Sequence, residues 1–453
     1  MKNKLAIYLS VLAMAIVITS CANGDDDGEY PYAYVKSFGV ENITSSYPSF
    51  TDDGKDTLVV KTISGDAFPF TINQASGEIY NNDSLPYATD LSKVVVNMNI
   101  EGIAAIYVDE SASYEYFSIA DSLDFTSPRK LRITSLSGNY SKYYTVSVNA
   151  HKVNPDLMEW KKAAAPSEII PEKAVEFNGD MLVFGKTDDG RPVVVSTPVY
   201  GDVSWSETEI TALPQNTDFS TVHVFDGLLY VVADGDLYAS SDAMEWYPVL
   251  QGNALLAIVG ASDADGLLWI ASADNMYCSA DGKAFETIGE LPVGFPLYGI
   301  STVSYPLVHN DEIICNMLVG YVTAEKNGTP KVWCKLSNYE SWVEYDNDEN
   351  PYPCPALAGL TVLRYANSLY ALGGKGEAGG VKVDAFASFY VSNDNGIVWK
   401  ASEDYYQRLP MDLQGDDSPF VATVDSGNHM WIITSGKKAT VWRGILNYLS
   451  FKE

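Results

Sequence analysis

Few side chains in this sequence are of the types that carry out chemistry at a protein site. Its 453 residues include 4 His and 5 Cys, which are too widely scattered for a zinc site. The 59 acidic side chains guarantee carboxylate pairs by chance, so no pair is singled out as a glycosidase acid and base. Residues Asp346–Asn350 begin like a calcium-binding loop, but Pro351 stands where that loop requires glycine. We therefore predict no catalytic residues and no cofactor beyond adventitious calcium.

The N-terminus is the one place where residue types predict covalent chemistry. Two lysines precede an apolar run from Leu5 to Ile18, which is typical of a secretory signal over residues 1–20. The run ends in Ile18-Thr19-Ser20-Cys21, which resembles the bacterial lipobox. The resemblance implies that Cys21 becomes the acylated first residue of the mature protein, held to a membrane by several acyl chains.

Residues 21–31 form an acidic tether that bears on location. Asp25, Asp26 and Asp27 lie among Gly and Asn, a composition typical of an unstructured linker. The segment also resembles the acidic export signal of surface-exposed lipoproteins of the Bacteroidota. This implies an outer-membrane protein that faces the cell exterior, with a periplasm-facing anchor as the alternative.

The charge balance excludes one class of partner. The chain has 29 Lys and Arg against 59 Asp and Glu, a formal net charge of -30. Such a field repels phosphate backbones and anionic headgroups, so we expect no nucleic-acid binding. Membrane contact is expected through the lipid anchor alone.

Residues 32–152 are expected to form a β-sandwich. Short alternating or β-branched runs recur between Gly, Asn, Asp and Ser, and Ser137-Gly138-Asn139 is typical of a hairpin turn. The series predicts an antiparallel sandwich of immunoglobulin-like build, without the Cys…Trp…Cys pattern of true immunoglobulin domains. The expected strands include residues 57–63, 68–73, 93–100, 114–119, 129–134 and 143–149.

Residues 153–453 repeat a pattern of turns and aromatic side chains. Six polar or glycine turns each lead into an apolar strand, at intervals of 39 to 60 residues, the size of a four-stranded propeller blade. The fold class expected is thus all-β, a sandwich followed by a six-bladed β-propeller. The turns are Asn178-Gly179, Asp226-Gly227, Asp265-Gly266, Asn310-Asp311, Asn367-Ser368 and Gly427-Asn428.

The two ends of the propeller are expected to join in one blade. Each repeat has an outer strand after its closing aromatic residue, but the sixth repeat stops just after Phe451. Residues Trp160–Ala163 form a spare strand before the first repeat. We predict that this strand completes the sixth blade, so that no edge is left open.

One turn of the propeller carries a recognisable motif. Ser392, Asp394, Gly396 and Trp399 occupy the fixed positions of an Asp-box, S-x-D-x-G-x-x-W. The carboxylate is expected to accept backbone N–H groups, the glycine to take a positive φ, and the tryptophan to pack between blades. In sialidases this motif is structural and lies away from the active site, so it predicts stability rather than catalysis.

Almost the whole chain resembles a family of Bacteroidota lipoproteins of unknown function, with an immunoglobulin-like N-terminal domain and a kelch-like propeller. The resemblance is carried by residues 79–87, 144–149 and 441–444, and Tyr370-Ala371-Leu372-Gly373-Gly374 resembles a kelch strand. It implies the fold and an outer-membrane location, and it implies no activity.

Two function classes stay open on this scaffold. A sialidase is disfavoured because the propeller has four arginines and no arginine motif of that type. A copper oxidase is disfavoured too, although His223, His309 and His429 lie beside predicted inner strands. We favour a binding protein for a glycan, a peptide or a partner lipoprotein over a glycan-degrading hydrolase or lyase, since propellers host both.

The predicted ligand face is the one that collects the long loops. Residues 291–304, 346–358, 374–387 and 403–419 all fall on the face that carries the connections between blades. They contain aromatic groups suited to stacking on sugar rings or peptides, although each could instead pack its loop against the ring. The candidate ligand residues are Phe295, Tyr298, Tyr352, Tyr405, Tyr406 and Arg408.

Overall fold

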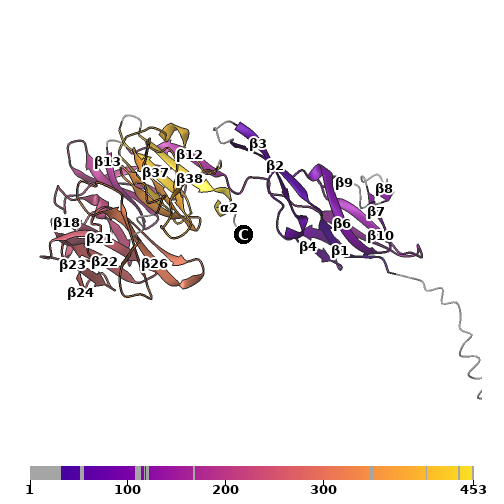
Figure 1. The fold of residues 1–453 in the computed structure, drawn as a ribbon, viewed down its shortest axis with the longest axis horizontal. Coiled ribbons are helices and arrows are strands. Elements are labelled where there is room, and N and C mark those ends of the chain that lie inside the picture. Colours follow the sequence, from indigo (N-terminus) through magenta and orange to yellow (C-terminus); the bar gives the residue numbers. More distant parts are fainter. Residues whose placement is uncertain are drawn as a thin grey trace, which may run out of the picture. The chain divides into compact units, whose positions relative to one another are not determined.

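The computed structural model describes residues 32–50, 56–107, 114–116, 118, 122–166, 169–345, 350–404, 406–436 and 439–450. Cys21, the acidic tether, the loop 346–349, Tyr405 and Phe451 lie outside these residues. The chain divides into two compact units, Met1–Pro155 and Asp156–Glu453, and each is built almost wholly of strands (Figure 1). In the part of the chain that is described, no helix has the length and apolar character needed to cross a membrane.

Two sheets enclose the core of the N-terminal unit. One is three-stranded and the other six-stranded, and a separate two-stranded ribbon joins β2 (Ile43–Phe50) to β3 (Asp56–Ile63). The first sheet has the order β1 (Tyr34–Val40), β6 (Val94–Glu101) and β9 (Ser122–Leu123). The second has the order β4 (Phe70–Asn73), β5 (Glu78–Asn81), β11 (Ser141–Ser147), β10 (Arg129–Thr134), β7 (Ile103–Tyr107) and β8 (Tyr114–Tyr116).

Alternation along the strands places one face of each sheet in a shared core. Val35 of β1, Ile79 of β5 and Ile133 of β10 are each fully buried in one cluster. Tyr144 of β11 is buried with them, and its hydroxyl accepts a hydrogen bond from the Val35 N–H at 3.2 Å. This bond ties the first strand of the unit to one of its last.

One strand pair departs from the expected antiparallel arrangement. β5 and β11 run parallel, with Ile79 opposite Val146. The chain leaves the six-stranded sheet after the β4–β5 hairpin, passes through β6, and returns beside β5 only in β11. The buried Asn81 side chain extends the pairing, because its amide donates to the Asn149 carbonyl at 2.8 Å and accepts from the Asn149 N–H at 2.7 Å.

Six four-stranded sheets form the blades of the C-terminal unit in the residues that the structure describes, beside one small three-stranded sheet. The first three blades are β13 (Ile169–Phe177), β14 (Asp180–Thr187), β15 (Pro192–Pro198), β16 (Ser206–Glu209); β17 (His223–Phe225), β18 (Leu228–Ala233), β19 (Asp236–Ser240), β20 (Tyr247–Leu250); and β21 (Leu255–Ser262), β22 (Leu267–Ser272), β23 (Asn275–Ser279), β24 (Glu286–Glu290). The other three are β25 (Tyr298–Leu307), β26 (Asn310–Tyr321), β27 (Lys331–Leu336), β28 (Val343–Glu344); β30 (Thr361–Tyr365), β31 (Ser368–Leu372), β34 (Tyr390–Ser392), β35 (Lys400–Ala401); and β36 (Phe420–Val424), β37 (Met430–Thr434), β38 (Thr440–Leu446), β12 (Met158–Ala164).

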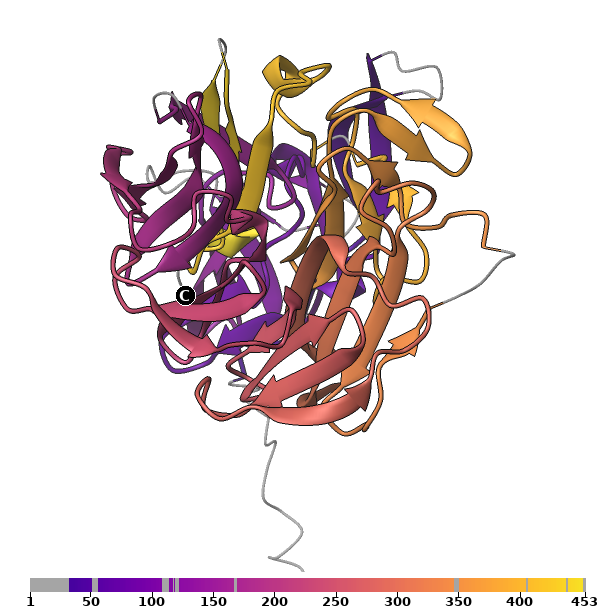
Figure 2. The same cartoon turned by 90° about the vertical axis from the view of Figure 1, so that its left-hand side faces the viewer.

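The innermost strands of these sheets form a closed ring. β13, β17, β21, β25, β30 and β36 each contact the next in this order, and β36 contacts β13 (Figure 2). Hairpin turns with positive φ start the second strand of several blades: φ is 53° at Asn178 and 85° at Gly179, and 46° at Asp226 and 69° at Gly227. Two successive positive φ values are typical of the type I′ turn, whose twist matches that of the strands it joins.

The last blade takes its outermost strand from the start of the unit. β12 pairs with β38 along its length, from Met158 opposite Leu446 to Ala164 opposite Thr440. The Trp160 ring lies flat over Gly444, where a Cβ atom would come within 2.6 Å of it. The Trp160 indole also donates to the Arg408 carbonyl at 2.7 Å. The strand is therefore fixed by backbone pairing and by one tryptophan.

The turn from Ser392 to Trp399 is held by its own side chains. Asp394 Oδ1 accepts from the Val398 N–H at 2.9 Å and from the Ser392 hydroxyl at 2.8 Å. Gly396 has a φ of 90°, and its carbonyl accepts from the indole of the buried Trp399 at 2.9 Å. Asp242 and Asp281 accept backbone N–H groups in the same way in blades two and three.

Loss of β12 should destabilise the propeller. A chain that begins at Pro166 lacks the partner of β38 and the buried Met158, and truncation of one buried Met costs about 2–5 kcal/mol. We expect it to melt well below a chain that begins at Asn154, by thermal unfolding followed with circular dichroism. Equal melting temperatures would show that β12 does not contribute to closure.

Candidate functional site

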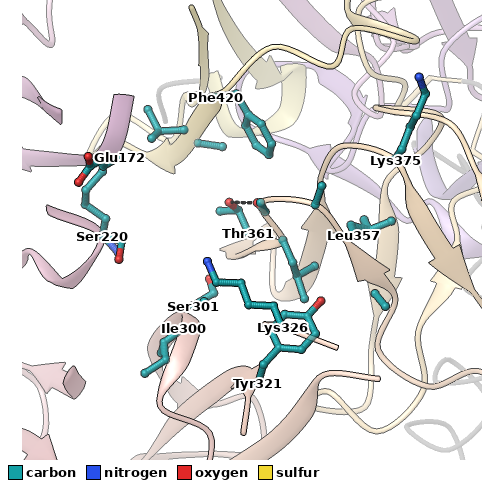
Figure 3. A pocket seen from close by; sticks show the side chains of 18 of the residues that line it. Glu172, Ser220, Ile300, Ser301, Tyr321, Lys326, Leu357, Thr361, Lys375 and Phe420 are labelled. Carbon is teal, nitrogen blue, oxygen red and sulfur yellow. Dashed lines mark hydrogen bonds between the residues drawn. The ribbon is translucent and has the colours of Figure 1, made fainter. Parts of the chain in front are cut away.

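A cavity of about 490 Å³ opens at the end of the ring where the innermost strands begin (Figure 3). We call it the mouth cavity. Strands from four blades and one short turn surround it, and connections between blades complete the wall. Among its lining residues are Glu172 and Lys173 of β13, Ser220 of η3 (Phe219–Thr221), Ser301 of β25, Thr361 of β30 and Phe420 of β36.

A second cavity continues from the mouth cavity along the axis of the ring. It measures about 350 Å³ and is lined by the middle parts of β13, β17, β25, β30 and β36. We call it the channel. Lys173, Ser301 and Thr361 line both cavities, so the two form one continuous funnel into the centre of the propeller.

Three of the four long loop segments contribute to the mouth cavity. Gly299 and Ile300 come from residues 291–304, Leu357 from residues 346–358, and Lys375 from residues 374–387. A small sheet of β29 (Ala356–Leu357), β32 (Gly376–Ala378) and β33 (Val381–Val383) braces the last two. These three segments therefore form part of the wall of the mouth cavity, and none of the lining residues comes from residues 403–419.

Lys326 extends over the mouth cavity. Figure 3 shows its side chain reaching toward Ser301. Its stem lies against Gly299, where a Cβ atom would be 3.1 Å from the Lys326 Cδ and where φ is +55°. Glycine is required at position 299 on both counts, because a side chain would displace the lysine and strain the backbone.

Lys173 lies where the mouth cavity meets the channel. Its ammonium has no hydrogen bond or ion pair with any other residue that the structure describes. The surrounding strands exclude bulk water although the side chain keeps some exposure to the channel, and this desolvation lowers the pKa of Lys173 to about 8. An isolated ammonium at such depth is costly, and perturbed lysines of this kind concentrate at functional sites.

His223 and Thr302 bridge the channel beside Lys173. The His223 Nε2 lies 2.8 Å from the Thr302 hydroxyl, and its Nδ1 lies 3.0 Å from the Thr221 carbonyl. Burial, followed by the charge of Lys173, lowers the pKa of His223 to about 3. The imidazole is therefore neutral at physiological pH, and the positive charges that line the channel are those of Lys173 and Arg364.

The carboxylates of the funnel are already engaged. Glu172 accepts from the Phe219 N–H at 2.8 Å and lies 3.4 Å from the Lys186 ammonium. Glu176 accepts from the Ser426 hydroxyl at 2.7 Å. At the rim of the mouth cavity, Lys375 is neutralised by an ion pair with Asp417.

Two aromatic side chains line the mouth cavity. The Tyr321 hydroxyl makes no hydrogen bond with another described residue, and burial raises its pKa to about 12. The Phe420 ring faces the cavity in Figure 3 and packs edge-on against Phe386, with ring centroids 4.7 Å apart. The cavity thus offers a phenol, an aromatic face, hydroxyls and an ammonium.

The ligand residues chosen from the sequence do not gather at this cavity. Phe295 is buried in the core, where its ring centroid is 5.1 Å from that of Trp333 and 5.5 Å from that of Trp342. Its ring therefore presents no surface to a ligand. Tyr298 is half-buried at the start of β25, and it does not line the mouth cavity.

Tyr352, Tyr406 and Arg408 lie at the edge of the ring. Tyr352 is exposed beside β35, with the Lys400 ammonium 4.8 Å from its ring centroid. The Tyr406 and Arg408 carbonyls hold β12, accepting from the Met158 N–H at 2.9 Å and the Trp160 indole at 2.7 Å. The segment that carries them serves closure of the last blade.

Three residues of the cavity lie outside the long loops in which ligand residues were predicted. They are Lys173, Tyr321 and Lys326. Lys173 carries a detectable signal, a lysine in the middle of the otherwise largely apolar β13. A charged side chain on an innermost strand of a propeller must face the channel or pair with an opposite charge, because burying it unpaired between blades is costly. Tyr321 and Lys326 are near neighbours in the sequence, but nothing in it indicates that they share a cavity with Lys173.

The structure presents no metal centre in its described ranges. No group of three or more His, Cys, Asp or Glu side chains within them could hold a metal ion. His223 and His429 belong to different local networks, because the His429 Nδ1 lies 3.2 Å from Asp425 Oδ1.

Solved structures with a similar fold include an alpha-L-arabinanase of Penicillium chrysogenum, an alpha-L-arabinofuranosidase of Fusarium graminearum and a gluconolactonase of Xanthomonas campestris. Sequence identities are 12%, 11% and 12%, and TM-scores are 0.38 in each case. The matches cover 64%, 64% and 62% of this chain, and 98%, 97% and 88% of the other chains. At this identity the likeness concerns the fold alone. No curated protein matches the sequence.

Family models account for both units of the chain. Residues 39–148 match the domain of unknown function DUF6242 N-terminal domain. Residues 154–453 match the DUF6242 beta propeller domain. This match covers more than half of the chain, and its description as a β-propeller agrees with the ring of sheets. The chain therefore belongs to the DUF6242 family, with its N-terminal domain and its β-propeller.

Proposed function

We propose that this protein is a lipid-anchored, cell-surface binding protein that takes up a glycan in the mouth cavity of its propeller. The observation that carries the proposal is the lining of that cavity. An aromatic face at Phe420, the unpaired Tyr321 hydroxyl and the Lys326 ammonium surround a space of about 490 Å³. Aromatic faces stack on the C–H surfaces of sugar rings, while hydroxyl and ammonium groups bind sugar oxygens.

Engagement of the carboxylates supports binding over hydrolysis. Glycosidases use two carboxyl groups about 5–9.5 Å apart on either side of the scissile bond. Among the described residues that line the funnel, the carboxylates are Glu172 and Glu176, both on β13. Four positions along a strand correspond to about 13 Å. Each is also held by other groups, Glu172 by Lys186 and Glu176 by Ser426.

Substitutions in the mouth cavity should abolish glycan binding. We expect Phe420→Ala and Lys326→Ala each to weaken binding of any oligosaccharide identified on a glycan array by about 10-fold or more, since each removes one stacking or charge-assisted contact. Titration calorimetry measures the affinity, and chromatography of the ligand should detect no product.

Tyr352→Ala is the matched control, because it removes an exposed aromatic group that lies away from the cavity. Its affinity should equal that of the wild type, and the melting temperature of Lys326→Ala should be unchanged. If Tyr352→Ala lost binding while the cavity variants kept it, the mouth cavity would not be the glycan site. An array without any bound glycan would contradict the proposal.

Replacement of Cys21 should release the protein from membranes. The motif that ends at Cys21 supports acylation of this cysteine. A single acyl chain binds a protein to a membrane only weakly, whereas several chains anchor it stably. We expect Cys21→Ala to move from the detergent-rich phase to the aqueous phase in phase partitioning. Retention of the variant with the membrane would refute the anchor. Replacement of Asp25, Asp26 and Asp27 by Ala should keep the lipid but end protease accessibility on intact cells.

A further inference from the structure

Two ammonium groups of the funnel lack a carboxylate partner among the described residues. Lys173 lies at the junction of the two cavities and Lys326 lies over the mouth. Both other charges at the mouth are compensated, Lys375 by Asp417 and Glu172 by Lys186. In a chain with a formal net charge of -30, the funnel therefore carries an excess of positive charge.

The position of Lys173 is costly unless something compensates it. Its ammonium is held in the centre of a ring of strands, where an uncompensated charge loses solvation. Beside it, the bridge between His223 and Thr302 supplies polar groups at 2.8 Å from each other. An anion that entered the channel would meet the Lys173 ammonium as its counter-ion, because the neutral His223 and Thr302 already bond to each other and to the Thr221 carbonyl.

We propose that the channel is a subsite for the anionic group of an acidic saccharide, with Lys173 as its counter-ion and Lys326 at the entrance. The proposal rests on the glycan site proposed above and names the substrate class. The sugar ring would occupy the mouth cavity against Phe420, and its charged substituent would point down the funnel. A charge-assisted hydrogen bond in a site shielded from water is stronger than one at the surface.

The test compares two forms of one saccharide. Trigalacturonate carries a carboxylate on every ring, and its methyl ester has the same sugars without the charges. We expect the wild type to bind the acid about 10–100-fold more tightly than the ester, the factor that corresponds to one hydrogen bond to a charged group. Lys173→Met should lose most of this preference, although Lys326 and Arg364 remain in the funnel. The variant should be at least as stable to unfolding as the wild type, because the substitution removes an uncompensated buried charge.

Lys375→Met is the matched control. It removes the same charge from the same cavity, but at a lysine that Asp417 already neutralises. The preference for the acid should persist in this variant. A sulfated disaccharide and its desulfated form, measured in the same way, decide between a carboxylate and a sulfate as the natural anion.

Raising the pH should change the affinity for the acid and the stability of the protein in opposite directions. The ammonium of Lys173 loses its proton as the pH rises through about 8, so affinity for the acid should fall between pH 7 and pH 9. Deprotonation also relieves the cost of the buried charge, so the free energy of unfolding should rise as the pH increases from about 8 towards 10.5, the ordinary pKa of a lysine. Glu172, Glu176, His223 and Arg364 also face the funnel, and Lys173→Met isolates the lysine because these groups remain.

The outcomes distinguish this inference from the proposed function. Equal binding of acid and ester by the wild type, with loss of both in Phe420→Ala, would overturn the anionic subsite and leave the glycan site in place. The same follows if array ligands are neutral and trigalacturonate does not bind. An acid preference in Lys173→Met as large as that of the wild type would also overturn the subsite.

A separate observation concerns two cysteines in blade four. Cys315 of β26 and Cys334 of β27 are both buried, and their Sγ atoms lie 2.9 Å apart. Met317 is directly opposite Cys334, so the two cysteines are diagonal neighbours on one face of the sheet. Because a disulfide has an S–S length of about 2.05 Å, less than 1 Å of movement would join them.

We infer that Cys315 and Cys334 form a disulfide when the protein folds after export. The two thiols give up two protons and two electrons, and the disulfide of a thiol oxidoreductase takes them up to become two thiols. Such oxidants act in exported compartments. The bond would add a covalent link between β27 and β26, the strand that ends at Tyr321 in the wall of the mouth cavity.

Alkylation followed by mass spectrometry tests this bond. In the full chain purified after export and denatured without reductant, we expect Cys278 and Cys354 to be alkylated and Cys315 and Cys334 to be protected and cross-linked. Reduction should expose all four and lower the melting temperature by about 5–10 °C. Complete alkylation of Cys315 and Cys334 without reductant would overturn the inference.

Discussion

Hydrogen bonding between β12 and β38 is the constraint on which the propeller depends. A sheet of three strands in the last blade would leave an unpaired edge, and β12 covers that edge with residues from the start of the unit. The same join is secured on the inside of the ring, where Ser426 donates to Glu176 of the first blade. The channel and its mouth exist because the ring is closed, since their walls combine strands of the first and last blades with those between.

The blades share a regular scaffold but differ in the loops they carry. Compact turns such as Ser392–Trp399 satisfy their own polar groups and leave little surface for a ligand. The opposite face carries the long connections of blades four and five, which build the mouth cavity. Such a separation, with short structural turns on one face and long loops on the other, is typical of folds in which a rigid scaffold positions the loops that bind ligands.

The funnel carries positive charge although the protein as a whole is strongly acidic. The acidic surface repels anions at long range, but salt screens this repulsion beyond about 8 Å. Inside the funnel the nearest charges decide, and there Lys173 and Lys326 have no carboxylate partner among the residues described. His223 beside Lys173 is neutral, and the Arg364 guanidinium in the same channel stacks on the Tyr305 ring, so the Lys173 ammonium is the cation that carries the proposed contact with an anionic group.

The sequence by itself determined the all-β class, the ring of repeats and the role of Trp160, because these depend on local turn chemistry and on periodic spacing. Asn178-Gly179 and Ser392–Trp399 specify their turns within a few residues of chain. The parallel pairing of β5 with β11 and the burial of Phe295 were decided by tertiary structure. So was the meeting of Lys173 of the first blade and Phe420 of the last with Tyr321 and Lys326, which are neighbours in the fourth. Closure of the ring brings these side chains together over long separations in sequence, and no local pattern encodes which residues then face a common cavity.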